Sequence, residues 1–272
     1  MRFTDEENAM DTAAVPLRER TYRDVVPLRL RDMLGDVNRF AVTCSTCKLK
    51  ERCLAEGLDA EAMKRIDGLV TARIRLRKGE TLFRAGDRFT SLYVIRSGSC
   101  KTVSLSDDGR DQIVGYHMSG DVIGTDGVST GSHATQARSL EDTQVCVLSF
   151  ERIEAMGRQD SGLQHNLHRL FSREIARERA IMMVFGMRSE QRLAAFLLDL
   201  SQRYHARGYS SHEFVLRLTR EEIGSYLGLR IETVSRLLSR FQRDGLIRVQ
   251  GRVVKLLDRQ PMERLVDSSD WL

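Results

Sequence analysis

The sequence lacks long apolar runs and is poor in aromatic residues. Only 6% of its 272 residues are aromatic, and it has one tryptophan and three prolines. No stretch approaches the run of about 18 apolar residues that a membrane-spanning helix requires, and the acidic start Met1–Asn8 has no signal-peptide core. We therefore expect a cytoplasmic protein without a membrane span, whose thiols stay reduced, because structural disulfides are disfavoured there.

The motifs of common enzymes are missing as well. The six histidines are scattered, and the chain contains no HExxH, no Walker loop and no nucleophile elbow. The sequence therefore does not predict an enzyme. A net charge of +5 makes nucleic acid a candidate partner, but so mild an excess of positive charge decides nothing by itself.

Three of the only five cysteines stand within ten residues of one another. Cys44, Cys47 and Cys53 have the spacing C-x2-C-x5-C. Thiols this close together hold a metal, form a disulfide or do redox chemistry. Soft sulfur donors select zinc, copper(I) or an iron–sulfur cluster, and these residues alone do not distinguish among them.

A block of short apolar runs extends from about residue 74 to residue 150. Runs such as Leu92–Ile95 are separated by glycine turns, for example at Gly79, Gly86 and Gly98. Turns at intervals of about 8–12 residues are typical of an antiparallel sandwich or barrel. We therefore expect an all-β domain here.

A long helix is expected from Leu163 to Met187, a stretch without proline and with one late glycine. Along it, residues recur at the 4-3-4-3 spacing of a two-helix seam; they are Phe171, Ile175, Glu178, Met182 and Phe185. An ordinary helix lying on the sheet is the alternative. In a parallel dimer Glu178 would approach its own symmetry mate, and the two like charges would oppose association.

The C-terminal part of the chain predicts a winged helix-turn-helix. Thr219 and Glu222 form a capping box that opens a helix, and Gly228 ends that helix. A second helix begins near Ile231, and residues 245–256 read as two strands around a Gln-Gly turn. Two helices joined by a tight turn and followed by a hairpin define this motif.

The second helix of the motif is expected to read DNA, because its N-terminal part enters the major groove in such proteins. The residues off its core face are Glu232, Thr233, Ser235, Arg236 and Arg240. Arg236 suits a bidentate contact with guanine, and Glu232 can accept from a cytosine amino group. Between Arg217 and Arg252 eight arginines outnumber four acidic residues, which favours attraction to phosphate.

Together these motifs resemble the CRP/FNR transcription regulators. The resemblance is carried by Leu193–Phe196, Tyr226–Phe241, Leu82–Asp87 and Leu92–Gly98, and it covers about residues 39–258. It implies an α+β fold with an antiparallel β-roll (a jelly roll of the cyclic-nucleotide-binding type) as sensor domain, a long dimerisation helix and a C-terminal winged helix-turn-helix. We accordingly divide the chain into an N-terminal extension (1–40), a sensor domain (41–160), a dimerisation helix (161–188), a DNA-binding domain (189–260) and a tail (261–272).

The cysteine spacing is similar to that of the FNR branch, the oxygen-sensing regulators of anaerobic metabolism. This resemblance implies a [4Fe-4S] cluster as cofactor, held by Cys44, Cys47, Cys53 and, from the β-roll, Cys146. It also implies a homodimer that forms when the cluster is intact, binds double-stranded inverted repeats of the TTGAT type and acts with RNA polymerase. Glu178 matches an acidic residue that keeps the monomers apart until the cluster forms.

Other positions carry over individually or depart from the family. Glu232, Ser235 and Arg236 match the base-reading positions. Arg230 stands where relatives have Ser or Thr as the cap of the recognition helix, so we expect an uncapped helix and an arginine that contacts phosphate. Cys100 has no counterpart among the ligands and is expected to be a small buried hydrophobe.

Two other kinds of regulator compete with this interpretation. A cyclic-nucleotide regulator grips sugar and phosphate with a Gly-Glu and an Arg-Ser pair. The matching positions here read Gly124-Thr125 and His133-Ala134, so we expect no cyclic nucleotide. A zinc-stapled regulator stays open, because four thiolates satisfy a tetrahedral zinc site equally well.

Overall fold

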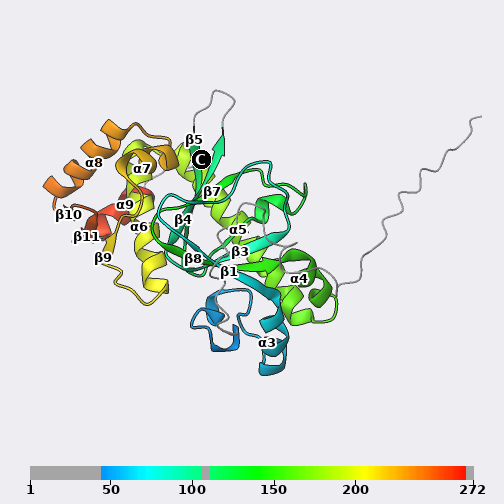
Figure 1. Ribbon diagram of the computed structural model, residues 1–272. Coiled ribbons are helices and arrows are strands. Elements are labelled where there is room, and N and C mark those ends of the chain that lie inside the picture. The colour runs from blue at the N-terminus through cyan, green and yellow to red at the C-terminus, as the bar shows by residue number, and fades with distance from the viewer. Residues whose placement is uncertain (1–43, 106–110, 268–272) are drawn as a thin grey trace, which may run out of the picture.

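The computed structural model describes residues 44–105 and 111–267. A β-roll occupies its centre, a winged helix lies at one end, and the cysteine-bearing loop lies with α3 (Ala60–Ile66) at another (Figure 1). The extension expected over residues 1–40 falls outside the described residues. Within those residues no helix is both long and apolar enough to cross a bilayer.

The roll consists of two four-stranded antiparallel sheets, which confirms the expected fold class. One sheet has the order β1 (Val70–Leu76), β8 (Thr143–Ser149), β3 (Ser91–Ser97), β6 (Val122–Ile123). The other has the order β2 (Thr81–Phe83), β7 (Gln136–Ser139), β4 (Ser99–Leu105), β5 (Asp111–Met118). Alternate strand residues point to opposite faces, so Val145 and Val147 of β8 are fully buried in the core of the roll while Cys146 between them faces outward. Cys100 is fully buried in the same core, as expected of a small hydrophobe.

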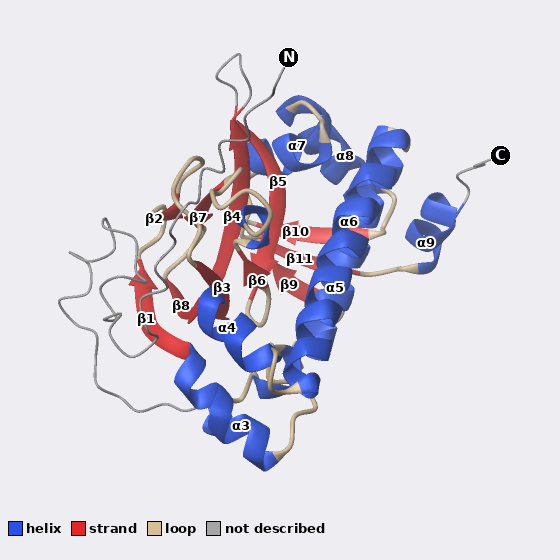
Figure 2. Cartoon of the chain, turned by 90° about the vertical axis from the view of Figure 1, so that its right-hand side faces the viewer, coloured by secondary structure: helices blue, strands red, loops and turns tan. Residues whose placement is uncertain are grey.

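Helix α4 (Phe150–Gly157), capped by Ser149, leads from the roll into α5 (Ser161–Gly186). The side chain of Asp160 caps α5 by accepting from the backbone N–H of Leu163. The expected long helix is therefore present. It runs along one side of the roll toward the winged helix, as Figure 2 shows.

The winged helix-turn-helix is also confirmed. It contains α6 (Ser189–Ala206), β9 (Glu213–Val215), α7 (Arg220–Leu227), α8 (Ile231–Arg243), β10 (Ile247–Gln250) and β11 (Val253–Leu256). Thr219 and Glu222 form the predicted capping box, and Gly228 ends α7 in the left-handed conformation with φ 63°. Arg230 precedes α8 without a side-chain cap, as expected.

The segment predicted as a C-terminal tail (261–272) contains a helix in its described part. Residues Gln260–Asp267 form helix α9, which packs on α6. Met262 is fully buried, and Leu265 and Val266, three and four residues later, lie on the same face, so a short amphipathic helix completes this core. Gln191 of α6 donates to the backbone oxygen of Leu265.

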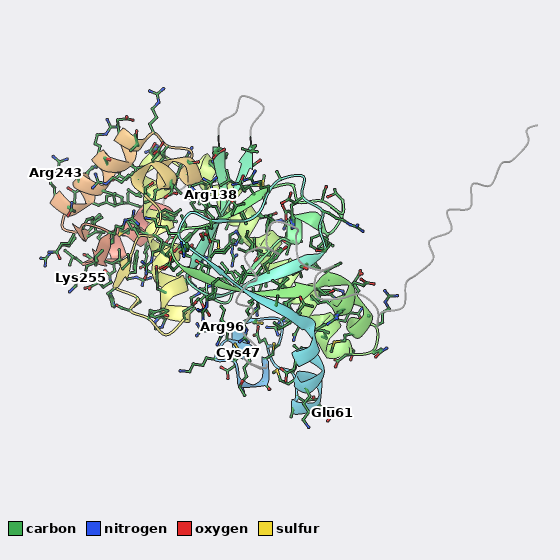
Figure 3. The ribbon with its side chains drawn as sticks, in the orientation of Figure 1. Cys47, Glu61, Arg96, Arg138, Arg243 and Lys255 are labelled. Carbon is green, nitrogen blue, oxygen red and sulfur yellow. The ribbon has the colours of Figure 1, made fainter. Side chains whose placement is uncertain are left out.

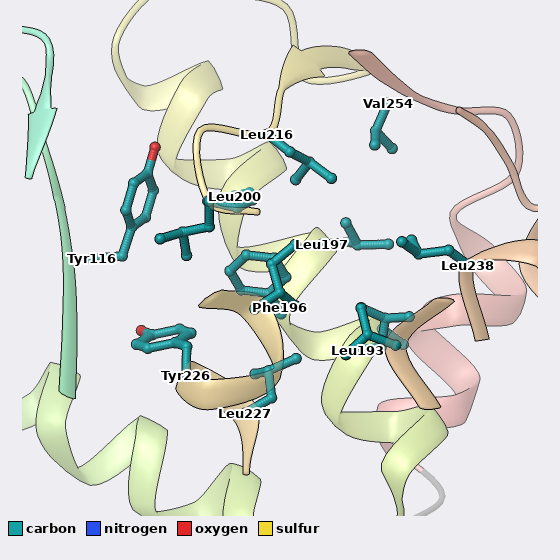
Figure 4. Packing of buried hydrophobic residues seen from close by; sticks show 14 of the residues in the cluster. Tyr116, Leu193, Phe196, Leu197, Leu200, Leu216, Tyr226, Leu227, Leu238 and Val254 are labelled. Carbon is teal, nitrogen blue, oxygen red and sulfur yellow. The ribbon is translucent and has the colours of Figure 1, made fainter. Parts of the chain in front are cut away.

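One continuous core joins the winged helix to the roll. Tyr116 of β5 packs with Phe196, Leu200 and Tyr226 of the winged helix (Figure 4). The ring centroids of Phe196 and Tyr226 are 5.8 Å apart in an edge-on arrangement. The DNA-binding part is therefore seated on the sensor domain rather than tethered to it.

Candidate functional site

Four thiols from distant parts of the chain line one small cavity. Cys44, Cys47 and Cys53 come from the loop before α3, and Cys146 comes from the outward face of β8, where it pairs with Arg73 of β1. Figure 3 shows Cys47 near Arg96, which lines the same cavity. Within the described part of the chain, no three His, Cys, Asp or Glu side chains form a ready group for a single metal ion.

Short hydrogen-bonded turns shape the cysteine loop. The backbone N–H of Cys47 donates to the carbonyl oxygen of Cys44 at 3.1 Å, closing the Cys44–Thr46 turn. Both the backbone N–H and the hydroxyl of Ser45 donate to the carboxylate of Asp67 at 3.1 Å, which anchors the loop beyond α3. The C-x2-C spacing thus places two sulfurs on one turn.

Burial favours the neutral form of three of these thiols, Cys44, Cys53 and Cys146. It raises the pKa of Cys44 to about 12, with further contributions from the charges of Cys53 and Cys146, and it raises the pKa of Cys53 to about 11. Burial also raises the pKa of Cys146, against the opposing effect of Arg73 and Arg96. A metal centre deprotonates its coordinating thiols and releases protons on binding. Four thiols that line one cavity beside Lys50, Arg73 and Arg96 therefore offer the soft donors and the nearby positive charge that an anionic metal–thiolate centre needs.

The loop is fastened directly to α5. The side-chain amide of Asn166 donates to the carbonyl oxygens of Leu54 and Glu56 at 3.0 and 2.7 Å. The carboxylate of Glu56 accepts from Arg169 at 2.9 Å and from Arg173 at 2.8 Å. No sequence pattern predicts these contacts, which join the segment after Cys53 to the first half of the helix.

Most side chains of the predicted dimer seam are exposed to solvent. Ile175, Met182 and Phe185 expose 53%, 72% and 40% of their surface, and Glu178 is exposed as well. Phe171 is half-buried against the core below the cysteine loop. Met183, which the 4-3-4-3 pattern did not include, is 59% exposed beside them. A contiguous stripe of exposed apolar side chains is typical of a protein contact surface.

Helix α8 presents most of its expected reading residues to solvent. Glu232 and Arg236 are exposed, while Thr233 and Ser235 are half-buried. The guanidinium of Arg220 lies 3.4 Å from the hydroxyl of Ser235. Arg240 is exposed too, but it pairs with Glu190 at 3.2 Å and with Asp244 at 3.6 Å, an arrangement that the sequence did not indicate.

At the positions that we matched to the phosphate-gripping pair of cyclic-nucleotide regulators, the backbone is bound by a side chain of the protein itself. The carboxylate of Asp126 accepts from the backbone N–H groups of Ala134 and Thr135 at 3.0 and 2.8 Å. It also accepts from the hydroxyl of Thr135 and lies 3.1 Å from Nδ1 of His133. This internal anion satisfies the donors at the matching positions.

Two family models match the chain in the places where the fold shows these parts. A cyclic nucleotide-binding domain matches residues 73–160, and a Crp-like helix-turn-helix domain matches residues 191–265. The transcriptional regulatory protein btr of Bordetella pertussis is 47% identical over 227 residues, covering 83% of this chain and 94% of that protein. The fumarate and nitrate reduction regulatory protein of Escherichia coli is 36% identical and covers 83% and 90%.

Solved structures agree with these relatives. FixK2 from Bradyrhizobium japonicum has a TM-score of 0.65 and 28% identity, covering 71% of this chain and 96% of that one. Sensor roll, long helix and winged helix together define a DNA-binding transcription regulator rather than an enzyme. The chain belongs to the CRP/FNR family of transcription regulators, and relatives of the FNR and Anr type are among its matches.

Proposed function

We propose that this regulator responds to oxygen through a [4Fe-4S] cluster and controls anaerobic gene expression from the cytoplasm. Cys44, Cys47, Cys53 and Cys146 would hold the cluster. The protein would then dimerise through α5, bind inverted repeats of the TTGAT type and act with RNA polymerase. The observation that carries the proposal is the convergence of all four of these thiols on one cavity.

The chain's own residues would convert the state of the loop into dimerisation. When bound, a [4Fe-4S] cluster supplies an oxygen-labile tie among the four sulfur atoms. The three loop cysteines would then hold the loop against β8. Asn166 and Glu56, through the hydrogen bonds described above, would fix the first half of α5 relative to that loop. To shift a two-state equilibrium from 1:99 to 99:1, cluster binding would have to favour one state over the other by about 5.5 kcal/mol.

Burial of the exposed stripe on α5 drives association, and Glu178 opposes it. Ile175, Met182 and Phe185 would leave water in the dimer, each contributing in proportion to the apolar area covered. Two Glu178 carboxylates would face each other across the seam. The dimer would set its two copies of α8 about one helical turn apart on a palindrome.

The direct test compares DNA affinity with and without oxygen. We expect protein purified without oxygen to retard a palindromic TTGAT duplex, and the same sample to lose most of this affinity after exposure to air. Equal affinity in both conditions would contradict oxygen control.

Substituting Arg236 tests how α8 reads DNA. Arg236→Ala should cost about 1–3 kcal/mol in binding and relax specificity at one base pair of each half-site, since a bidentate arginine–guanine contact is lost. Binding to a set of single-base operator variants measures this. Arg243→Ala at the far end of α8, also exposed, is the matched control and should keep the base preference. A uniform loss across all operators would identify Arg236 as a phosphate contact instead.

Cyclic AMP should have no effect on DNA affinity. The carboxylate of Asp126 already holds the backbone donors of Ala134 and Thr135, and a phosphate there would meet a like charge. Titration of cyclic AMP into a DNA-binding assay should leave the dissociation constant unchanged. A strong, saturable increase in affinity would revive the cyclic-nucleotide alternative. The zinc alternative predicts a colourless, air-stable protein.

A further inference from the structure

Asp121 lies in a turn that the roll holds firmly. The turn joins β5 to β6, and Gly120 adopts φ +91°, which favours glycine. The backbone N–H of Gly120 donates to the carbonyl oxygen of Ile95 at 2.8 Å, and that of Ile95 donates back to Asp121 at 3.0 Å. The N–H of Met118 donates to the Asp121 carboxylate at 2.8 Å. The carboxylate therefore has a fixed position on the sensor domain.

Three arginines from two other elements converge on this carboxylate. Arg177 of α5 lies 3.2 Å from it, Arg203 of α6 lies 2.8 Å from it, and Arg207, the C-cap residue of α6, lies 2.6 Å from it. The Asp121 side chain is only 7% exposed. Burial by itself would raise the pKa of Asp121, but the three guanidinium groups hold it well below its usual range. One buried charge thus joins the sensor roll, the dimerisation helix and the first helix of the DNA-binding domain.

Arg203 and Arg207 make further contacts with the same end of β5. Arg203 donates to the carbonyl oxygen of Tyr116 at 2.8 Å and stacks over its ring at 5.3 Å from the centroid. Arg207 donates to the carbonyl oxygen of Ser119 at 2.7 Å. A guanidinium held by several acceptors at once has a fixed direction as well as a fixed position. Rotation of α6 about the carboxylate is thereby restricted.

A second set of contacts joins the roll to the winged helix through α7. Lys101 of β4 pairs with Glu222 of the α7 capping box at 2.6 Å. The backbone N–H of Ile113 in β5 donates to the hydroxyl of Ser225 in α7 at 2.9 Å. Two separated anchoring points define an orientation, whereas a single one would leave a pivot.

We propose that Asp121 is a positioning residue that fixes the orientation of the winged helix on the sensor roll and on α5, and thereby sets the distance between the two reading helices of the dimer. The proposal goes beyond oxygen sensing and needs only a dimer that binds DNA. Half-site separation follows from the distance between recognition helices, so loss of this fixed orientation should loosen the choice of spacing. Single half-sites, read by one α8, should not be affected.

The cysteine loop lies beside the same turn, because Arg52, Gly120 and Asp121 line one cavity. A side chain built on Gly120 would lie 3.5 Å from Cβ of Arg52, the residue before Cys53. The cysteine loop and the winged helix therefore both lie next to the turn between β5 and β6.

The test uses full-length Asp121→Asn, which keeps the shape of the side chain and removes its charge. Asp199→Asn is the matched control, because Asp199 is 55% exposed and pairs with Arg203 at 3.5 Å within α6, without bridging to the roll. Affinity is measured on duplexes whose half-sites are separated by different spacers, and on a single half-site. We expect Asp121→Asn to bind the duplex with the best spacing about tenfold more weakly than the parent protein. Its affinity should also depend less on spacing, and its affinity for a single half-site should be unchanged. Asp199→Asn should match the parent protein in all three measurements.

Hydrogen exchange provides a readout without DNA. Asp121→Asn should speed exchange in the last turn of α6 and leave the α7–α8 core protected as in the parent. A parent-like spacing profile, or an equal loss on full and half sites, overturns the proposal. Arg207→Gln removes one of the three cations and should shift the spacing profile in the same direction, so it replaces Asp121→Asn if that variant does not fold. If parent DNA binding ignores oxygen, the proposed function fails while this comparison still decides the role of Asp121.

Discussion

Replacing Cys146 by serine should abolish retention of the iron–sulfur centre. Cys146 is the only one of the four cavity thiols that belongs to the sheet, so its loss leaves the loop cysteines without a thiol partner on the roll. Serine keeps the size of the side chain but replaces the soft sulfur donor by a hard oxygen. Iron and acid-labile sulfide, measured in protein purified without oxygen, should fall to background.

Cys100→Ser is the matched control for this substitution. Cys100 is fully buried inside the roll, away from the cavity, and burial raises its pKa to about 12. Its replacement should leave the iron content unchanged, with a modest loss of stability from an unpaired buried hydroxyl. Equal loss of iron from both variants would show that the ligand assignment is wrong.

Glu178→Ala should produce a protein that is partly dimeric and binds DNA in air. Glu178 is exposed between Ile175 and Met182 on the seam, so its carboxylate would face its own copy in the dimer. Repulsion between two unit charges about 4 Å apart is roughly 1–4 kcal/mol between water and a protein surface. Removing it should favour the dimer by about fivefold or more. Sedimentation and DNA retardation of the aerobic protein measure the change.

The control removes the same charge elsewhere. Glu61→Ala, on the exposed face of α3, should leave the aerobic protein as monomeric as the parent (Figure 3). A strictly monomeric Glu178→Ala protein would refute the role of this residue in the seam. Dimerisation of both variants to the same extent would mean that net charge, rather than position, controls association.

Much of the fold could be predicted because its signals are local. The capping box at Thr219 and Glu222, the turn at Gly228 and the apolar periodicity of α8 each lie within a few residues, and each was found where the pattern indicated. Alternation within β8 likewise predicts that Cys146 faces away from the buried Val145 and Val147. The selection of Cys146 as the partner of the loop, however, came from the family resemblance, because no spacing rule joins residues so far apart.

The contacts that link the parts could not be predicted. Glu56 meets Asn166 across 110 residues of sequence, and Asp121 meets Arg203 across 82. Arginine is abundant in this chain, so no composition or period singles out the few that pair with a buried carboxylate. Asp126 was missed for the same reason, since a lone aspartate in a turn gives no sign of the donors that its carboxylate will meet.

The visible absorption spectrum of protein purified without oxygen tests the central claim most directly. The account predicts a brown protein whose absorption bleaches in air, in step with loss of iron and sulfide and of DNA affinity. A colourless, air-stable protein that contains zinc and binds DNA equally well with and without oxygen would contradict it.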